Sequence, residues 1–346
     1  MNARNARFPR LATLAGAAFL AWLAAGLSAA AEPRPAVARR IEEAGQKPAD
    51  PKVEKRQEVG PPAEREPEDG EAVEFLRLKR DSKDNPLSLD TSIVRYREPA
   101  EAAARAGRKT PLEVDLVGAV HLGSRDYYDQ LDRRFKDYDA VLYELVAPDN
   151  ARVPKPGRKA SGAIGSAQQG MTKMLGLEFQ LEQIDYTSPN FVHADLSPRE
   201  FDAAMAKRGE SWWTMFTKLM RESVDRAERG ESAGPTIGFG DLFGILFGAD
   251  REVRLRRIMA EQFTDMDVLT AAFGGEEGSS LITDRNAAAI DVLRDQIAKG
   301  RRRIAIFYGA AHMEDFDRRL RKEFRLQPRE TIWLEAWDLR NPAGRN

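Results

Sequence analysis

Two apolar runs in this chain each end in Gly-Ala-x-His and lead directly into a charged, amphipathic stretch. The first run begins at Leu112 and ends in Gly118-Ala119-Val120-His121, and the second begins at Ile304 and ends in Gly309-Ala310-Ala311-His312. A short apolar run followed by an amphipathic pattern predicts a buried strand and then a helix. Repeated strand–helix units form parallel sheets covered by helices, so the pattern predicts an α/β domain.

The predicted domain has a central mixed sheet built from two related strand–helix halves, with helices packed outside. We predict the following elements: strands at 93–96, 112–117, 140–145, 304–308 and 331–334, and helices at 125–136, 281–299 and 313–324. A strand–helix–strand unit crosses over with a right hand, so strands 112–117 and 140–145 are expected to be parallel neighbours. A mostly helical insertion, 163–273, separates the halves, with helices at 163–184, 212–229 and 251–273. A further helix is predicted to begin at a capping box formed by Ser197 and Glu200, and the apolar, glycine-rich stretch 237–247 resembles a mobile lid or a buried connector.

The first 31 residues have the pattern of an export signal. Three arginines within the first ten residues precede an apolar core at 11–27, and small residues stand before Glu32. This order is typical of a signal peptide, and the apolar core is shorter than a comfortable membrane span. We therefore expect an exported protein, periplasmic or secreted, with no stable membrane insertion after cleavage. An uncleaved N-terminal anchor is the alternative.

Composition limits the remaining choices. Residues 32–70 are rich in Pro and Glu and poor in large apolar residues, which predicts a disordered linker before a folded domain at 71–340. Lys and Arg number 54 against 55 Asp and Glu, a balance that gives no reason to expect nucleic acid as a partner. The chain has no cysteine, so disulfides and thiolate metal ligands are excluded.

The two motif histidines are candidates for a shared site. His121 and His312 are two of only three histidines in the chain, and each follows a glycine by three residues. Glycine leaves room for a ligand, and the carboxyl ends of parallel strands are where open α/β sheets bind ligands. Each histidine could instead be a hydrogen-bonded packing residue, but the repeated context favours a shared functional site.

Glu144 is an anomaly in the apolar strand pattern 141–146. A buried carboxylate is costly unless it has a cation, a metal ion or a proton. Glu144 could pair with an arginine such as Arg285, or it could be a metal ligand or general base beside His121, at the end of the neighbouring strand.

Two further pairs of residues are weaker candidates. His193 and Asp195 are two apart in an extended segment, which suits a third metal ligand with an orienting carboxylate, or a local hydrogen-bonded pair. Arg285 and Asn286, on the predicted helix before the second motif, could hold a substrate carboxylate or an oxyanion. A surface salt bridge is the alternative for Arg285.

At these residues the chain resembles the TraB/PrgY/GumN family. Paired Gly-x-x-His motifs, a Glu on the strand after the first and an Arg-Asn pair before the second carry the resemblance, which spans 112–334. The family is related to the Tiki metalloproteases and, more distantly, to erythromycin esterase and ChaN-like proteins. The resemblance implies an α/β core of two related halves, with His121, His312, Glu144, Arg285 and Asn286 as its site residues. In the Tiki branch such a site supports peptide hydrolysis with manganese or cobalt.

The leading hypothesis is therefore an exported, divalent-metal-dependent hydrolase, most simply a peptidase with a peptide or protein substrate. His121, Glu144 and His312 would bind the ion, with His193 as a further ligand, and zinc is a candidate beside manganese and cobalt. Glu144 could instead accept a proton from the attacking water, and Arg285 would anchor the substrate. A metal-free esterase is a rival of the same class. A non-catalytic module that sequesters a peptide or haem is a rival of another class.

Overall fold

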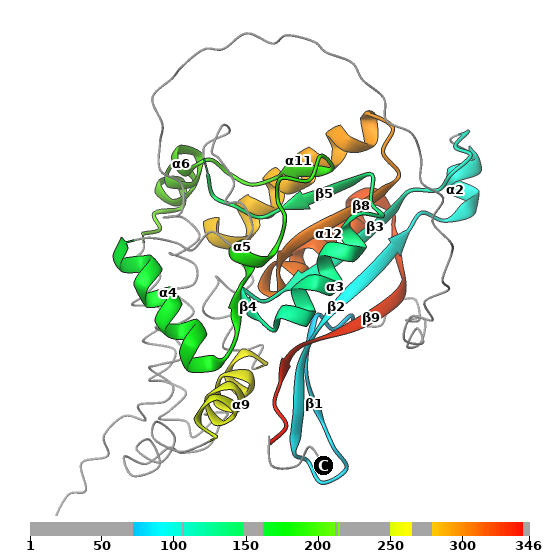
Figure 1. Cartoon of the computed structure of the whole chain (residues 1–346). Helices are drawn as coiled ribbons and strands as arrows, with labels where there is room; N and C mark the ends of the chain where they lie inside the picture. Colours follow the sequence, from blue (N-terminus) through cyan, green and yellow to red (C-terminus); the bar gives the residue numbers. More distant parts are fainter. Residues whose placement is uncertain are drawn as a thin grey trace, which may run out of the picture.

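The computed structural model describes residues 72–105, 107–147, 162–211, 214, 250–264 and 279–341. Its centre is a mixed sheet with the strand order β1-β2-β3-β8-β5-β7, and β9 pairs with β2 (Figure 1). The strands are β1 (Leu76–Arg80), β2 (Pro86–Arg97), β3 (Glu113–Ala119), β5 (Ala140–Tyr143), β7 (Phe191–His193), β8 (Arg303–Gly309) and β9 (Gln327–Asp338). The predicted α/β class with a central mixed sheet is confirmed.

The four strands β3, β8, β5 and β7 run parallel, with β7 at the edge of the sheet. The prediction that β3 and β5 are neighbours is wrong, because β8 lies between them and pairs with both. The run Ile304–Tyr308 explains this order, since each of its residues is fully buried. A strand that is apolar on both faces belongs in the centre of a helix-covered parallel sheet.

The antiparallel part of the sheet is longer than the sequence pattern indicated. The predicted strands 93–96 and 331–334 are segments of β2 and β9, which pair from Ser88 opposite Asp338 to Arg97 opposite Gln327. On its other side β2 pairs first with β1 and then with β3. Figure 1 shows β1 and the start of β2 extending as an arm away from the helix-covered sheet.

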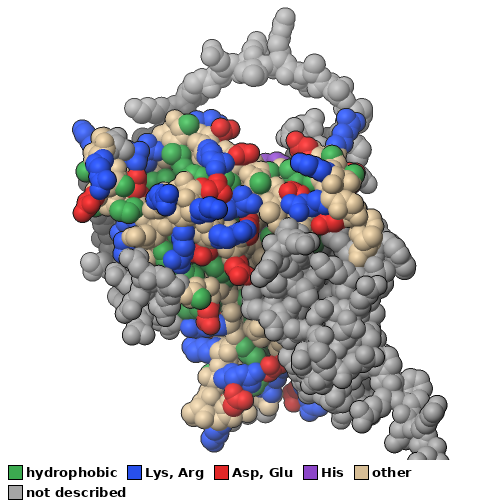
Figure 2. All heavy atoms as spheres, turned by 180° about the vertical axis from the view of Figure 1, so that it is seen from behind, with side chains coloured by type: hydrophobic (Ala, Val, Ile, Leu, Met, Phe, Trp, Pro, Cys, Tyr) green, Lys and Arg blue, Asp and Glu red, His purple; other side chains and the backbone are tan. Residues whose placement is uncertain are grey.

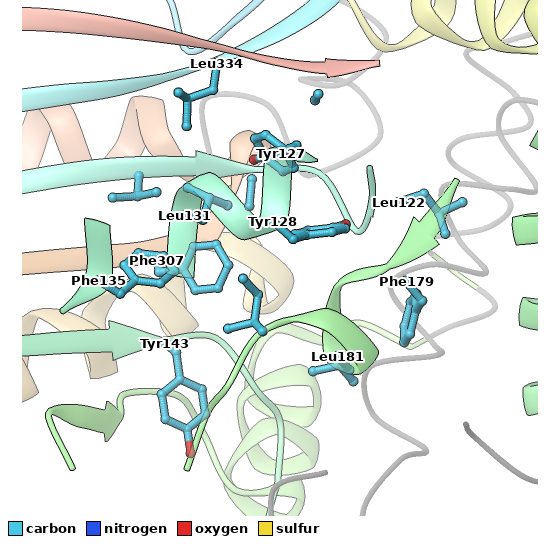
Figure 3. Close-up of a cluster of buried hydrophobic side chains, with 14 of the residues drawn as sticks. Leu122, Tyr127, Tyr128, Leu131, Phe135, Tyr143, Phe179, Leu181, Phe307 and Leu334 are labelled. Atoms are coloured by element: carbon cyan, nitrogen blue, oxygen red, sulfur yellow. The ribbon is translucent and has the colours of Figure 1, made fainter. Parts of the chain in front are cut away.

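Helices cover both faces of the parallel strands. On one face lies α3 (Arg125–Phe135), which begins at the N-cap Ser124 and buries four residues against the sheet. Figure 3 shows these four side chains, which lie between the helix and the strands: Tyr127, Tyr128, Leu131 and Phe135. On the other face, α11 (Arg285–Ala298) and α12 (Met313–Phe324) pack against β3, β8 and β5 in a second apolar cluster. Burial of two such layers is the main stabilising term of the fold.

The outer surface of α11 and α12 carries charges of both signs. Figure 2 shows Lys and Arg side chains interspersed with Asp and Glu over the back of the molecule. On these two helices they form ion pairs: Arg294 with Asp291 and Glu323, Arg318 and Arg319 with Asp315, and Arg321 with Asp317. Exposed pairs of this kind contribute little stability individually.

The predicted helix 163–184 is two helices separated by a turn. The first, α4 (Gly162–Leu175), ends because Gly176 adopts a left-handed conformation (φ +61°), the usual helix-terminating role of glycine. The chain then forms β6 (Glu178–Phe179), which pairs with β4 (Leu122–Gly123), and the short helix α5 (Gln180–Gln183). This break in the helix places Gln180 next to the first Gly-Ala-x-His segment.

Where the structure describes it, the rest of the predicted insertion is helical apart from one strand. β7 joins the main sheet beside β5, so the insertion contributes to the core. The capping box predicted at Ser197 is present at the start of α6 (Pro198–Arg208). Within the described residues, the predicted helix 251–273 is represented by α9 (Arg251–Phe263). Among the described residues, a further short helix, α2 (Ala100–Arg105), lies outside the insertion.

Several predicted segments lie outside the described residues. These are the export signal 1–31, the linker 32–70, helix 212–229 and a glycine-rich stretch at 237–247. Within the described ranges, each helix is too short or too polar to cross a membrane.

Candidate functional site

The two Gly-Ala-x-His motifs end side by side on adjacent parallel strands, but they are offset by one residue. Ala119, not Gly118, is opposite Gly309 in the register of β3 and β8. The glycines therefore face opposite sides of the sheet. A Cβ at Gly118 would contact the side chain of Met313, whereas one at Gly309 would lie 3.7 Å from Nε2 of His121. The sequence pattern suggested two equivalent strand ends, and this offset removes that equivalence.

The segment that carries His121 is fixed through its carbonyl groups. Four donors bind consecutive or nearly consecutive carbonyls: Tyr127 Oη to Gly118 (3.3 Å), Tyr128 Oη to Val120 (3.0 Å), the Gln180 N–H to His121 (2.9 Å) and Trp337 Nε1 to Leu122 (2.6 Å). Buried carbonyls without a partner are destabilising, so these donors determine the path of the backbone. His121 is consequently held on an ordered segment.

Replacement of Trp337 by phenylalanine should loosen this segment. Trp337 is buried, and the variant leaves the Leu122 carbonyl without its indole donor, which costs about 1–3 kcal/mol. Chemical denaturation should show this loss in the free energy of unfolding. The matched control is Trp333→Phe, because Trp333 is only partly buried beneath the guanidinium of Arg77. Equal losses in the two variants would contradict the role assigned to the Trp337 hydrogen bond.

Glu144 is the first residue after β5 and is almost completely buried, with 4% of its surface exposed. Its Oε1 accepts a hydrogen bond from Arg285 Nη2 (2.8 Å) and lies 3.5 Å from Nε2 of His312. Its Oε2 accepts the backbone N–H of Gly309 (2.7 Å). Burial raises the pKa of Glu144, but the charge of Arg285 and the imidazole of His312 outweigh it and hold that pKa well below its ordinary value. Glu144 is therefore ionised at neutral pH.

Arg285 joins Glu144 to a second buried carboxylate. Its Nε and Nη2 donate to Asp195 (2.9 and 2.6 Å), and its Nη1 donates to the Leu281 carbonyl (3.5 Å). Arg285 follows a π-helical turn, Ser280–Asp284 (η2), which begins the predicted helix 281–299; such turns are frequent at functional sites. Of the alternatives for Glu144, the pair with Arg285 is thus formed. Asp195, predicted as a partner of His193, instead orients the guanidinium.

Asn286 fixes the ring of His312. Its Nδ2 donates to two groups that can only accept, the His312 carbonyl and the Asp315 carboxylate, both at 3.0 Å. Its Oδ1 must then face Nδ1 of His312, which lies at 2.6 Å and carries the proton of this hydrogen bond. Nε2 of His312 lies on the side of Glu144, 3.5 Å from Oε1. Asn286 therefore influences the site by orienting the ring of His312.

His121 has an amide partner of the same kind. Its Nδ1 lies 3.2 Å from Oε1 of Gln180, and its Nε2 faces Gly309. Burial lowers the pKa of His121 in spite of the opposing charge of Glu144, so its ring is neutral at neutral pH. Gln180 did not stand out in the sequence, because it is 59 residues from His121 and lay inside a predicted helix. The Gly176 helix end was the only signal in that region.

His193 makes its contacts elsewhere. Its Nε2 lies 2.6 Å from the carbonyl oxygen of Leu145, and its ring meets the ring of Tyr143 edge-on. His121, Glu144 and His312 are not among these partners. The structure thus brings together three of the four predicted ligands and gives His193 a local hydrogen bond.

We expect His193→Gln to leave divalent-metal affinity unchanged. Glutamine keeps a polar group near the Leu145 carbonyl, and no ligand is removed if the site consists of His121, Glu144 and His312. Titration of manganese, cobalt or zinc into the variant and the wild type checks this. A loss of affinity of about tenfold or more, the scale of a lost supporting contact, would show that His193 belongs to the site.

The donor set fits a divalent cation by its chemistry. Two imidazoles and an ionised carboxylate suit manganese, cobalt and zinc, and outer-shell hydrogen bonds to Nδ1 are typical of histidine ligands. A Cβ at Gly309 would lie 3.4 Å from Glu144 Oε2 and 3.7 Å from His121 Nε2, so glycine leaves space beside both donors. Within the described ranges, no three His, Cys, Asp or Glu side chains form a preassembled metal site.

Comparisons of the chain with protein-family models, curated proteins and solved structures find no match. The resemblance to the TraB/PrgY/GumN family therefore stays a prediction from the motifs. A fold of this class hosts many activities, so function has to be argued from the site residues.

Proposed function

We propose that this protein is a divalent-metal-dependent hydrolase of peptides, with His121, Glu144 and His312 as the metal ligands. One arrangement carries the proposal: two imidazoles, each with an amide oxygen at Nδ1, meet one ionised carboxylate beside Gly309. Histidines held in this way present Nε2 as a ligand. The meeting point is the carboxyl edge of parallel strands, where α/β sheets bind ligands.

Glu144 is better suited to be a ligand than a general base. An efficient base has a pKa near the working pH, and the pKa of Glu144 is held well below its ordinary value. The same interactions keep the carboxylate charged and oriented, as a ligand requires. Its hydrogen bonds from Arg285 and Gly309 leave lone pairs on both oxygens.

In this proposal, Arg285 orients the carboxylate of Glu144. It donates hydrogen bonds to Glu144, Asp195 and the Leu281 carbonyl, and only 4% of its surface is exposed. These contacts engage four of the five N–H groups of the guanidinium, which leaves little of it for the predicted role as a substrate anchor. Asn286 correspondingly orients His312.

When bound, a divalent ion supplies Lewis-acid activation of water and of a scissile carbonyl group. The chain itself orients the ligands through Asn286 and Gln180. It also contributes charge, because the two carboxylates of Glu144 and Asp195 are paired with the single guanidinium of Arg285. This leaves one negative charge, which favours a cation. The proposed setting is outside the cytoplasm, on the basis of the export-signal pattern at 1–31.

The test is hydrolysis of a quenched-fluorescence peptide library by the purified protein. We expect cleavage that stops after chelation and returns with manganese, cobalt or zinc, and that is absent in His121→Ala and His312→Ala but retained in His193→Gln. Cleavage that resists chelation would replace the proposal with a metal-free hydrolase. Tight binding of peptide or haem without any cleavage would replace it with a sequestering module.

A further inference from the structure

Gln180 is tied to His121 at two points. Its backbone N–H donates to the His121 carbonyl (2.9 Å), and its side-chain Oε1 lies 3.2 Å from Nδ1 of the ring. The side chain is buried, with 4% exposed, and its Nε2 lies 2.7 Å from the hydroxyl of Tyr186. The amide therefore has partners at both ends and occupies one position.

We propose that Gln180 is the positioning residue of His121: it holds the ring with a proton on Nδ1 and turns the Nε2 lone pair toward Glu144 and Gly309. This rests on the proposed function and extends it to a residue outside the predicted site. The amide NH2 donates to the Tyr186 hydroxyl, and the amide oxygen faces the imidazole. An oxygen at Nδ1 requires an N–H there, and in a neutral ring the lone pair is then on Nε2.

The second histidine supports this assignment. Asn286 Oδ1 faces Nδ1 of His312, and the two acceptor-only partners of its Nδ2 leave no other orientation. Gln180 and Asn286 therefore play matching parts for histidines on adjacent strands. An amide flip at Gln180 would instead place a proton on Nε2 of His121, on the side of Gly309 and Glu144. The position of the proton on the His121 ring therefore distinguishes the two amide orientations.

The site then works as a pair of amide–histidine units around one carboxylate. A neutral amide fixes the ring without adding charge, so the negative charge of the site remains that of the carboxylates. Second-sphere partners of this type typically change metal affinity about 10- to 100-fold when removed. We expect this range for Gln180→Met, and near wild-type affinity for Gln180→Glu, because a carboxylate also accepts from Nδ1–H.

The deciding measurement needs no metal. The protein is labelled with 15N at its three histidines, and two-bond 1H–15N spectra at about pH 8 report which ring nitrogen of each neutral histidine is protonated. We expect Nδ1–H for His121 in the wild type and in Gln180→Glu, and a shift toward Nε2–H in Gln180→Met. His312 should remain Nδ1–H in all three and serves as the internal control.

Wild-type His121 protonated on Nε2, or a His121 signal that is the same in Gln180→Met, would overturn the proposal. If Gln180→Met does not fold, the wild-type and Gln180→Glu spectra still decide the proton position. Metal titration separates this result from the proposed function. A wild type with the expected proton positions that binds no metal would contradict the hydrolase and leave the role of Gln180 intact.

Discussion

Gly309→Ala is expected to abolish metal binding and hydrolysis while the protein stays folded. The added methyl group would lie in van der Waals contact with Glu144 Oε2 (3.4 Å) and His121 Nε2 (3.7 Å), in the space that an ion held by these two donors would need. Gly309 has φ −54° and ψ 143°, which alanine adopts without strain. The free energy of unfolding should therefore be unchanged or higher by up to about 1 kcal/mol. Metal titration and thermal unfolding of the same sample measure both effects.

The control for this variant is Gly118→Ala in the first motif. A Cβ there would contact the backbone oxygens of Phe75 and Ser92 at 3.4 Å and the side chain of Met313 at 3.6 Å, on the opposite side of the sheet. Metal affinity in Gly118→Ala should match the wild type. Full affinity in Gly309→Ala as well would show that the ion does not use the space beside Gly309.

Arg285→Met is expected to cause the largest loss of stability among the site variants. It leaves Glu144 and Asp195 buried without their shared cation, and breaking a buried pair in this way costs about 3–5 kcal/mol. Chemical denaturation at neutral pH measures the loss. Arg97→Met is the control, because Arg97 is half exposed in its pair with Glu113 and should contribute less than about 1 kcal/mol.

The loss in Arg285→Met should depend on pH in a defined direction. In the wild type the pKa of Glu144 is below its ordinary 4.5, so Glu144 stabilises the fold above that value and stops doing so as pH falls. Without Arg285, burial is expected to raise this pKa, and the variant then loses stability as pH rises through it. The loss in the free energy of unfolding relative to the wild type should be larger at about pH 8 than at about pH 5. A pH-independent deficit would mean that Arg285 acts through packing alone.

The local pattern of the sequence predicted the elements that carry the site. Apolar runs with periodic helices after them located β3, β8, α3 and α12, and the capping box located the start of α6. Glu144 stood out because a carboxylate in an apolar run needs a partner, and Arg285, named as one choice, is that partner. These features depend on residues close together in sequence or on charge balance.

What the sequence did not predict depends on long-range register and orientation. β8 lies between β3 and β5. Which strand occupies the centre of the sheet depends on all the strands together, so a local sequence pattern does not indicate the strand order. Gln180 reaches His121 only after the chain turns at Gly176. Asp195 and His193 were expected to act together, but the fold directs Asp195 to Arg285 and His193 to the Leu145 carbonyl. Side chains two residues apart can have unrelated partners once a strand ends between them.

The most direct test of the central claim is the metal stoichiometry of the purified protein after equilibration with manganese, cobalt and zinc, measured for the wild type beside His121→Ala, Glu144→Gln, His312→Ala and His193→Gln. A single shared site predicts one ion per chain in the wild type and in His193→Gln, and loss of the ion in the other three, each shown to be folded by circular dichroism. A folded wild type that takes up none of the three metals would contradict the claim of a single shared site. So would a variant that keeps its ion when His121 and His312 are both replaced.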